Sequence, residues 1–269
     1  MVLGLDDHFY TYAVPLILVE TVIYVYAFTS ELRTCQAVLG LLGEFWCLAA
    51  LWVEVSLEHV YPGFDYENPV DPEMKAYKPF CDFAPWANCS KVLMSPKGRF
   101  LRFFGISKQG PVADDASLLD KIRYFIDVPN PTLGVIFFGV HLFYPILLLF
   151  TPIPILGPLL PELFFLACCG VGLMTCWLAF NLIFQLKDFC LVCVSMYVAN
   201  FGLIPMMHSL AQEGSTVGEA SFFGDVPSWF LVPFGALDFF MLVAVLVLYL
   251  KGPPAKAREA ADNYYLVVA

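Results

Sequence analysis

Charged side chains are scarce in this sequence. Only 14% of its 269 residues are Asp, Glu, Lys or Arg, whereas 59% are hydrophobic. A soluble domain usually carries about a quarter charged residues. The composition therefore excludes an ordinary water-soluble globule and indicates a protein that contacts lipid.

Basic residues are scarcer than acidic ones. The 14 Lys and Arg against 24 Asp and Glu give a formal charge of −10, which excludes the basic surface of a nucleic-acid-binding protein. Internal repeats are absent, and we expect no tightly bound nucleotide. Nine cysteines in a chain of this length are too few for a disulfide-stapled miniprotein, so their positions carry more information than their number.

Long apolar runs dominate instead. A helix needs about 20 apolar residues to cross the hydrocarbon core, and six stretches are long enough: residues 9–28, 35–57, 132–150, 163–186, 189–207 and 229–250. The first could be a signal peptide, but Asp6 and Asp7 make its flank acidic and no cleavage site stands out. We expect this helix to be retained.

The sequence predicts an all-α integral membrane protein. An extra N-terminal apolar helix occupies residues 1–30, a catalytic bundle residues 35–209, an additional transmembrane helix residues 228–250, and a polar tail residues 251–269. Within the bundle, residues 59–131 form a long extramembrane connection, here called the cap loop. A loop of that length is usually functional.

The nine cysteines fall into two groups. Five lie inside apolar helices and are interpreted as small hydrophobic side chains: Cys35, Cys47, Cys168, Cys169 and Cys176. The other four are extramembrane and lie on one side of the membrane. Cys81 and Cys89 belong to the cap loop, and Cys190 and Cys193 form a C-x-x-C motif where the helix of residues 189–207 begins.

The C-x-x-C motif is the clearest sign of chemistry. Its spacing places both sulfurs on one face of a helix, and the N–H groups and dipole of a helix N-terminus favour a thiolate. Thiolates attack disulfides and electrophiles. Two cysteine pairs on one membrane face therefore predict a relay between a soluble thiol protein and a molecule in the bilayer. The alternative is a structural zinc site, for which the spacing of Cys81 and Cys89 is poor; we expect no metal.

The cysteine-bearing segments resemble the vitamin K epoxide reductase family. The resemblance covers about residues 35–208 and rests on three segments in the same order: Cys81-Asp82 with Cys89-Ser90-Lys91-Val92, then Asn130-Pro131-Thr132-Leu133-Gly134, then Asp188-Phe189-Cys190-Leu191-Val192-Cys193. It implies a four-helix transmembrane bundle around a quinone pocket that the cap loop covers. The substrate would be a quinone of the vitamin K type or its epoxide.

The resemblance also implies a role for each relay cysteine. Cys193 would engage the quinone, and Cys190 would form a disulfide with Cys193 and accept electrons from Cys89. Cys81 would pair with Cys89 and exchange with a thioredoxin-like or disulfide-isomerase-like protein.

Three polar residues match family positions near the quinone. Asn130 and Tyr197 match the two polar contacts to the quinone oxygens, and Ser95 matches a serine of the cap loop. Each has an alternative structural role. Asn130 could cap the following helix, and Tyr197 could pack in the core. Ser95 precedes a proline and could mark a turn.

The ends of the chain depart from the family pattern. The animal enzymes lack the extra helix at each end, and residues 251–269 are too few for the thioredoxin domain fused to some bacterial and plant members. We therefore expect a separate reductant protein. Glu20 and Glu44 lie at bilayer depth, where a carboxylate costs about 3 kcal/mol. They could share a polar patch or meet a partner subunit, and Glu54 could reach the membrane surface.

Two arguments about orientation conflict. If all six stretches span, thirteen of the 14 Lys and Arg lie on the cysteine side, which would place that side in the cytoplasm. A disulfide relay favours an oxidising compartment, and the charge rule is weak for loops longer than about 60 residues. We expect a multi-pass protein of the endoplasmic reticulum with a lumenal active site; a thylakoid or bacterial inner membrane is the alternative.

Two functions are compatible with these features. The first is an enzyme that passes electrons from a soluble dithiol through both cysteine pairs to a quinone or vitamin K epoxide. The second is a non-catalytic family-like subunit of a larger membrane complex, which the additional helices would suit. The presence of all four relay cysteines favours the enzyme.

Overall fold

The computed structural model describes residues 9–60, 79–84, 86–108, 116–144, 156–213 and 228–251. Across these segments the regular elements are all helices. Five helices are long and apolar enough to cross a membrane: Phe9–Thr29, Leu32–Glu58, Leu159–Leu186, Leu191–Gln212 and Val232–Lys251. The prediction of an all-α membrane protein is confirmed.

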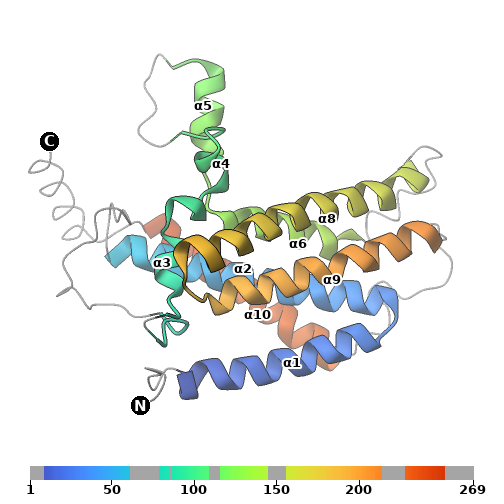
Figure 1. Ribbon diagram of the computed structural model, residues 1–269. Coiled ribbons are helices and arrows are strands. Elements are labelled where there is room, and N and C mark those ends of the chain that lie inside the picture. The colour runs from blue at the N-terminus through green and yellow to red at the C-terminus, as the bar shows by residue number, and fades with distance from the viewer. Residues whose placement is uncertain are drawn as a thin grey trace, which may run out of the picture.

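Helix α2 (Leu32–Val60) is the centre of the bundle (Figure 1). It is buried along most of its length, whereas the outer helices leave apolar side chains exposed where lipid would contact them. Its neighbours are α1 (Val14–Thr29), α6 (Asn130–Leu142), α9 (Leu191–Glu213) and α10 (Ser228–Lys251). Helix α8 (Leu156–Phe180) packs against α9.

The predicted span of residues 132–150 is described only in part. Helix α6 ends at Leu142, and residues 145–150 lie outside the described segments, as does the tail of residues 252–269. Helix α8 continues into a π-helix, η3 (Asn181–Leu186), which ends at Lys187 in the left-handed conformation, with φ of 53°. This residue reverses the chain, so that α9 starts only a few residues after α8 ends.

The described part of the cap loop is built from short helices. They are α3 (Cys89–Leu93), η2 (Pro96–Gly98), α4 (Phe100–Phe103) and α5 (Leu118–Phe125). Trp177 of α8 packs against three rings of this segment with centroid separations of 5.2–5.6 Å, from Phe100, Phe103 and Phe104. These contacts fix the middle of the cap loop to the bundle.

Ion pairs hold the same part of the cap loop. Arg99 pairs with Glu58 at 2.8 Å and with Glu54 at 3.4 Å, so Glu54 meets a cation at the end of α2. Asp127 pairs with Arg102 and accepts a hydrogen bond from Ser107 at 2.8 Å. Burial opposes ionisation of Asp127, but these hydrogen bonds and the neighbouring guanidinium groups lower its pKa below the usual value.

The other membrane acids have separate surroundings. Glu20 of α1 accepts a hydrogen bond from Ser195 of α9, whereas Glu44 of α2 lies near Asp238 of α10. The carboxyl groups of Glu44 and Asp238 are buried, and three of their oxygens have no hydrogen-bond partner within the described residues. Glu20 therefore belongs to one additional helix, α1, and bonds to α9, whereas Glu44 of α2 lies near the other additional helix, α10.

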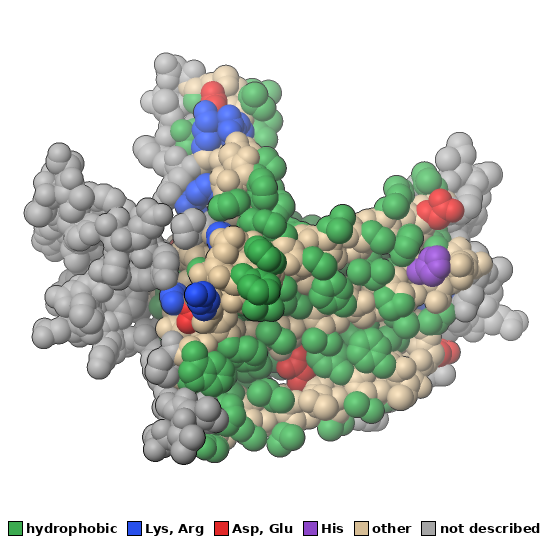
Figure 2. Space-filling view, in the orientation of Figure 1, with side chains coloured by type: hydrophobic (Ala, Val, Ile, Leu, Met, Phe, Trp, Pro, Cys, Tyr) green, Lys and Arg blue, Asp and Glu red, His purple; other side chains and the backbone are tan. Residues whose placement is uncertain are grey.

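Helix α5 projects from the bundle at 84° to α6 (Figure 1). One of its faces is apolar and exposed; Leu118 is 76% exposed and Phe125 is 85% exposed. Figure 2 shows apolar side chains along one edge of this projection and Lys and Arg side chains beside them. If α6 crosses the bilayer, a helix at a right angle to it lies along the membrane surface, where such an amphipathic helix is stable.

We expect α5 to lie in the membrane interface with its apolar face toward the lipid chains. A tryptophan introduced as Phe125→Trp should therefore be quenched by lipids brominated in their acyl chains. A tryptophan introduced as Tyr124→Trp, on the side of the helix away from Leu118 and Ile122, serves as the matched control and should be quenched little. Both variants would be reconstituted into vesicles, and the fluorescence of the parent protein would be subtracted from that of each variant before their quenching is compared. Equal quenching of both variants would contradict this orientation.

Candidate active site

The inner cysteine pair lies where α9 begins. Cys190 and Cys193 form a disulfide with a Cα–Cα distance of 5.2 Å. Cys190 directly precedes the first residue of α9, and its sulfur accepts a hydrogen bond from the backbone N–H of Cys193 at 3.3 Å. The sequence placed the start of this helix at residue 189; the helix starts at Leu191 because Phe189 is extended and paired with the cap loop.

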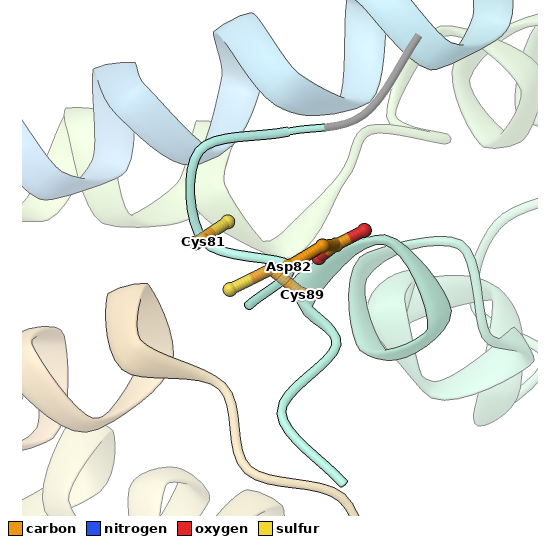
Figure 3. Close-up of side chains that lie close together, drawn as sticks. All are labelled: Cys81, Asp82 and Cys89. Atoms are coloured by element: carbon orange, nitrogen blue, oxygen red, sulfur yellow. The ribbon is translucent and has the colours of Figure 1, made fainter. Parts of the chain in front are cut away.

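The outer pair, Cys81 and Cys89, lies in the cap loop as two free thiols. Their sulfur atoms and a carboxylate oxygen of Asp82 lie within 4.8 Å of one another (Figure 3). The carboxylate of Asp82 accepts hydrogen bonds from the backbone N–H of Ser90, at 3.1 Å, and from its hydroxyl. Asp82 therefore holds the first turn of α3 beside the segment that carries Cys81.

Backbone hydrogen bonds join the two pairs. The N–H of Asn88 donates to the carbonyl of Phe189 at 3.0 Å, and the N–H of Phe189 donates to the carbonyl of Trp86 at 2.7 Å. Cys89 and Cys190 each follow a residue of this pairing, so the chain carries the two pairs into the same region.

An ion pair strengthens the same junction. Lys91 of α3 pairs with Asp188, whose side chain is only 3% exposed. Lys97, farther along the cap loop, donates a hydrogen bond to Gln185 at the end of η3.

The relay cysteines are shielded from solvent. Cys81, Cys89 and Cys190 are fully buried, and Cys193 is nearly so. Burial first, and then the neighbouring Cys89 and Asp82, raise the pKa of Cys81 well above its usual value, so Cys81 is a protonated thiol in this arrangement. The sequence predicted that the outer pair exchanges with a soluble protein; such a protein reaches these thiols only if the cap loop moves.

An aromatic cluster surrounds Phe83, which follows Cys81 by two residues in the cap loop. Its rings are Phe9 of the N-terminal helix, Phe83 and Trp86 of the cap loop, and Phe189; Phe83 lies 5.3–6.3 Å from each of the other three. Trp86 is partly exposed, whereas Phe83 is buried beneath it.

A cavity of about 490 Å³, measured out to its open mouth, lies beneath the cap loop. It is bounded by the cap loop, the start of α6, the end of α8 with η3, and the first turns of α9. Its lining is Val92, Leu93, Ser95, Lys97, Gly98, Asn130, Pro131, Leu178, Asn181, Leu182, Leu186, Cys193, Met196 and Tyr197. The cavity thus brings Ser95, Asn130 and Tyr197 together with Cys193.

The polar groups of the cavity differ in their partners. Asn130 does not cap α6: its amide donates to the carbonyl of Lys97 at 2.7 Å and accepts from the N–H of Phe100 at 2.6 Å, which ties the cap loop to α6. Ser95 donates to the carbonyl of Val92 at 2.8 Å. The Tyr197 hydroxyl has no hydrogen-bond partner within the described residues, so it is available to a ligand.

The model of the vitamin K epoxide reductase family matches residues 34–208. The chain belongs to this family. Membership identifies a membrane thiol–disulfide oxidoreductase, and the matched region contains α2, α6, α8 and α9 together with the cap loop. Helices α1 and α10 lie outside the match.

Sequence reasoning missed several lining residues of this vitamin K epoxide reductase family member. Asn181 lies in the π-helix η3, is almost fully buried, and donates to the carbonyl of Trp177 at 2.6 Å. A single π-turn inside a helix is common at functional sites, but the apolar sequence gives no sign of it. Met196 and Lys97 line the cavity only because α9 and the cap loop converge there.

The thiols and Asp82 are the only donor cluster for a metal ion within the described segments. A structural zinc ion uses four ligands, usually Cys or His. Here there are two thiols and a carboxylate that already bonds to Ser90. The two thiols and the carboxylate are therefore a poor ligand set for structural zinc, and Cys81 and Cys89 are better described as a dithiol pair.

Three of the five helix cysteines are buried in the hydrophobic core, in line with the sequence interpretation: Cys35, Cys47 and Cys168. The sulfur of Cys47 lies 3.3 Å from that of Met196. Cys168 also has a polar neighbour, because its sulfur lies 3.2 Å from Nε2 of His141. Cys35 is buried among apolar side chains, and Cys176 is exposed on the bundle surface.

The ion pair between Lys91 and Asp188 should hold the cap loop closed. Lys91→Met leaves a buried carboxylate unpaired, and because Lys91 is partly exposed we expect a loss of about 1–3 kcal/mol. Cys81 and Cys89 should then react faster with a membrane-impermeant maleimide, measured by mass spectrometry.

Two further variants control this experiment. The double variant Lys91→Met/Asp188→Asn removes both charges and should recover much of the protection. Lys108→Met breaks the exposed pair with Asp120 and should have no effect on alkylation. Unchanged alkylation in Lys91→Met would mean that this pair does not hold the loop.

Proposed function

We propose that the protein passes two electrons from a soluble dithiol protein to a quinone or vitamin K epoxide in the membrane. The observation that carries the proposal is that Cys193, alone among the four relay cysteines, lines the cavity that also contains Asn130 and Tyr197. The cavity is mostly apolar with few polar groups, which is the composition of sites for small apolar ligands.

The electron path starts at the cap loop. A soluble dithiol reduces a Cys81–Cys89 disulfide by thiol–disulfide exchange and leaves as a disulfide itself. A thiolate of Cys89 then attacks the sulfur of Cys190, and the Cys190–Cys193 bond breaks with Cys193 leaving as a thiolate. Attack of Cys81 on Cys89 releases Cys190. Two electrons and two protons have then moved from the outer to the inner pair.

In the proposed path, a reduced outer pair together with an oxidised inner pair is the state that would precede this inward transfer. The outer pair is reduced and the inner pair is a disulfide. Trp86 and Asn88 form backbone hydrogen bonds with Phe189. Cys89 follows Asn88 and Cys190 follows Phe189, so this pairing supports an exchange between the two cysteines.

The reduced inner pair then acts on the substrate. The Cys193 thiolate attacks the quinone, Cys190 attacks Cys193 to restore the disulfide, and the quinone leaves as a hydroquinone with two protons. Reduction of an epoxide uses the same two electrons and releases its oxygen as water. The free hydroxyl of Tyr197 and the remaining hydrogen-bonding capacity of the Asn130 amide would hold the two substrate oxygens, while Ser95 shapes the loop side of the cavity.

The donor and the compartment follow from the same chemistry. A thioredoxin-like or disulfide-isomerase-like protein would supply the dithiol, and the opening of the cap loop would expose Cys81 and Cys89 to it. An oxidising compartment suits the reaction, so we place the active site in the lumen of the endoplasmic reticulum.

Turnover with a chemical reductant tests the proposal. Purified protein would be incubated with dithiothreitol and either vitamin K epoxide or menadione, with Cys193→Ala beside the wild type. We expect turnover in the wild type and a loss of at least about 100-fold in Cys193→Ala, because the nucleophile is removed. Cys176→Ala, on the lipid side of α8, is a matched control and should retain activity.

A protein donor tests the order of the relay. With a thioredoxin-like donor alone, Cys89→Ser should accumulate the oxidised inner pair and turn over far more slowly, whereas dithiothreitol can reduce the inner pair directly. Wild-type rates in Cys89→Ser with the protein donor would refute the assigned role. A wild type without thiol-dependent turnover would favour the non-catalytic subunit, and metal analysis of the same sample tests for zinc.

A further inference from the structure

The N-terminal span Phe9–Thr29 consists of the π-helix η1 (Phe9–Ala13) followed by α1, and it contacts both cysteine-bearing segments, although it lies outside the family match at residues 34–208. In η1, Phe9 packs against Phe83, two residues after Cys81, with a centroid separation of 5.3 Å. In α1, two polar side chains reach Ser195 on α9, two residues beyond Cys193. Figure 1 shows α1 running along α9 and α2.

Glu20 and Tyr24 of α1 each form a hydrogen bond with Ser195 of α9. Its hydroxyl donates to Oε2 of Glu20 at 2.9 Å, and its carbonyl accepts from the hydroxyl of Tyr24 at 2.7 Å. The indole of Trp46, from α2, lies beside the same carboxyl group. Glu20 is only 7% exposed, and within the described residues its Oε1 has no hydrogen-bond partner.

Packing alone does not explain a carboxyl group at this position. The other buried residues of α1 are apolar, Ile23 and Ala27. A glutamate at bilayer depth costs about 3 kcal/mol, whereas a leucine there would pack against α2 and α9 at no such cost. The carboxyl group supplies what leucine cannot, which is an acceptor for the Ser195 hydroxyl.

Glu20 and Tyr24 hold α9 on the side opposite the cavity. Successive residues of an α-helix are rotated by about 100°. Ser195 is two residues from Cys193 and two from Tyr197, so it is about 160° around the helix from each and lies on the face of α9 opposite the cavity. Because Cys193 and Tyr197 both line the cavity, fixing the helix at Ser195 fixes the rotation of both side chains.

We infer that Glu20 and Tyr24 are positioning residues of the active site, which makes the additional N-terminal helix a working part of the enzyme. They act through Ser195 and do not touch the substrate. The inference rests on the proposed function, since positioning matters for catalysis only if Cys193 reacts in the cavity. Small displacements of a reacting group are costly in rate, because the near-attack geometry is lost.

The test compares variants that keep or remove the hydrogen bond. Glu20→Gln retains an acceptor for Ser195 and should turn over within about twofold of the wild type. Glu20→Leu removes it, and we expect kcat to fall about tenfold with KM changed less than about twofold. Tyr24→Phe should give a smaller loss of kcat. Thr21→Val is the control, because Thr21 is exposed on the same helix and its hydroxyl bonds only to Ile17.

A double-variant cycle distinguishes loss of the hydrogen bond between Glu20 and Ser195 from a general loss of stability. Ser195→Ala should cost as much kcat as Glu20→Leu, and the combination should cost little more than either alone, because both remove one interaction. Independent, multiplying losses would overturn the inference. So would a Glu20→Gln variant as slow as Glu20→Leu, because the charge and not the hydrogen bond would then matter. Thermal unfolding in detergent shows whether each variant folds.

A second readout does not depend on the quinone. The Cys190–Cys193 disulfide would be equilibrated with mixtures of reduced and oxidised dithiothreitol, and the reduced fraction measured by alkylation and mass spectrometry. A looser α9 holds the two sulfurs together less well, so Glu20→Leu should be half reduced at a several-fold lower ratio of reduced to oxidised reagent. No shift in a folded Glu20→Leu variant would overturn the inference, even if the wild type lacked turnover and the proposed function failed.

Discussion

The active site depends on the pairing of one extended residue with the cap loop. Phe189 exchanges backbone hydrogen bonds with the segment of residues 86–88, and this pairing carries Cys89 toward the start of α9, where Cys190 is placed. Without it the two cysteine pairs belong to unconnected segments, about 100 residues apart in the sequence. The pairing also shapes the cavity, because the same loop residues continue into the wall that contains Ser95 and Lys97.

The bundle supports this junction through α2 and α8. Helix α2 occupies the centre and ends in Glu54 and Glu58, which bind Arg99 of the cap loop. Helix α8 supplies Trp177 as a platform for the rings of α4. Buried ion pairs contribute little net stability once the cost of removing charges from water is counted. Their larger effect here is to specify where the loop meets the bundle.

Much of this arrangement was predictable from the sequence. Hydropathy predicts the long helices because lipid leaves few alternatives to a helix, and the spacing of the cysteines predicts a relay. The sequence did not reveal the π-helix at Asn181 or the loop contacts of Asn130, since both arise from packing between distant segments. The neighbours of Glu20 and Glu44 were hidden for the same reason. Periodicity identifies a buried face but not the side chain that faces it.

The burial of all four relay cysteines limits how the reaction proceeds. A soluble donor reaches Cys81 only when the segment of residues 81–91 leaves the bundle. The contacts that hold this segment include two backbone hydrogen bonds to Phe189, the ion pair between Lys91 and Asp188, and the aromatic cluster. Cys81, Phe83 and Cys89 are also buried in the core.

Opening must break these polar contacts and expose the buried side chains of the segment. Each backbone hydrogen bond contributes about 0.5–1.5 kcal/mol, and breaking the ion pair, in which Asp188 is buried, costs about 1–3 kcal/mol. The far side of the loop is held by separate contacts, through Arg99, Asp127 and Trp177. An opening confined to residues 81–91 would therefore expose the two thiols to the proposed donor while these contacts keep the wall of the cavity in place.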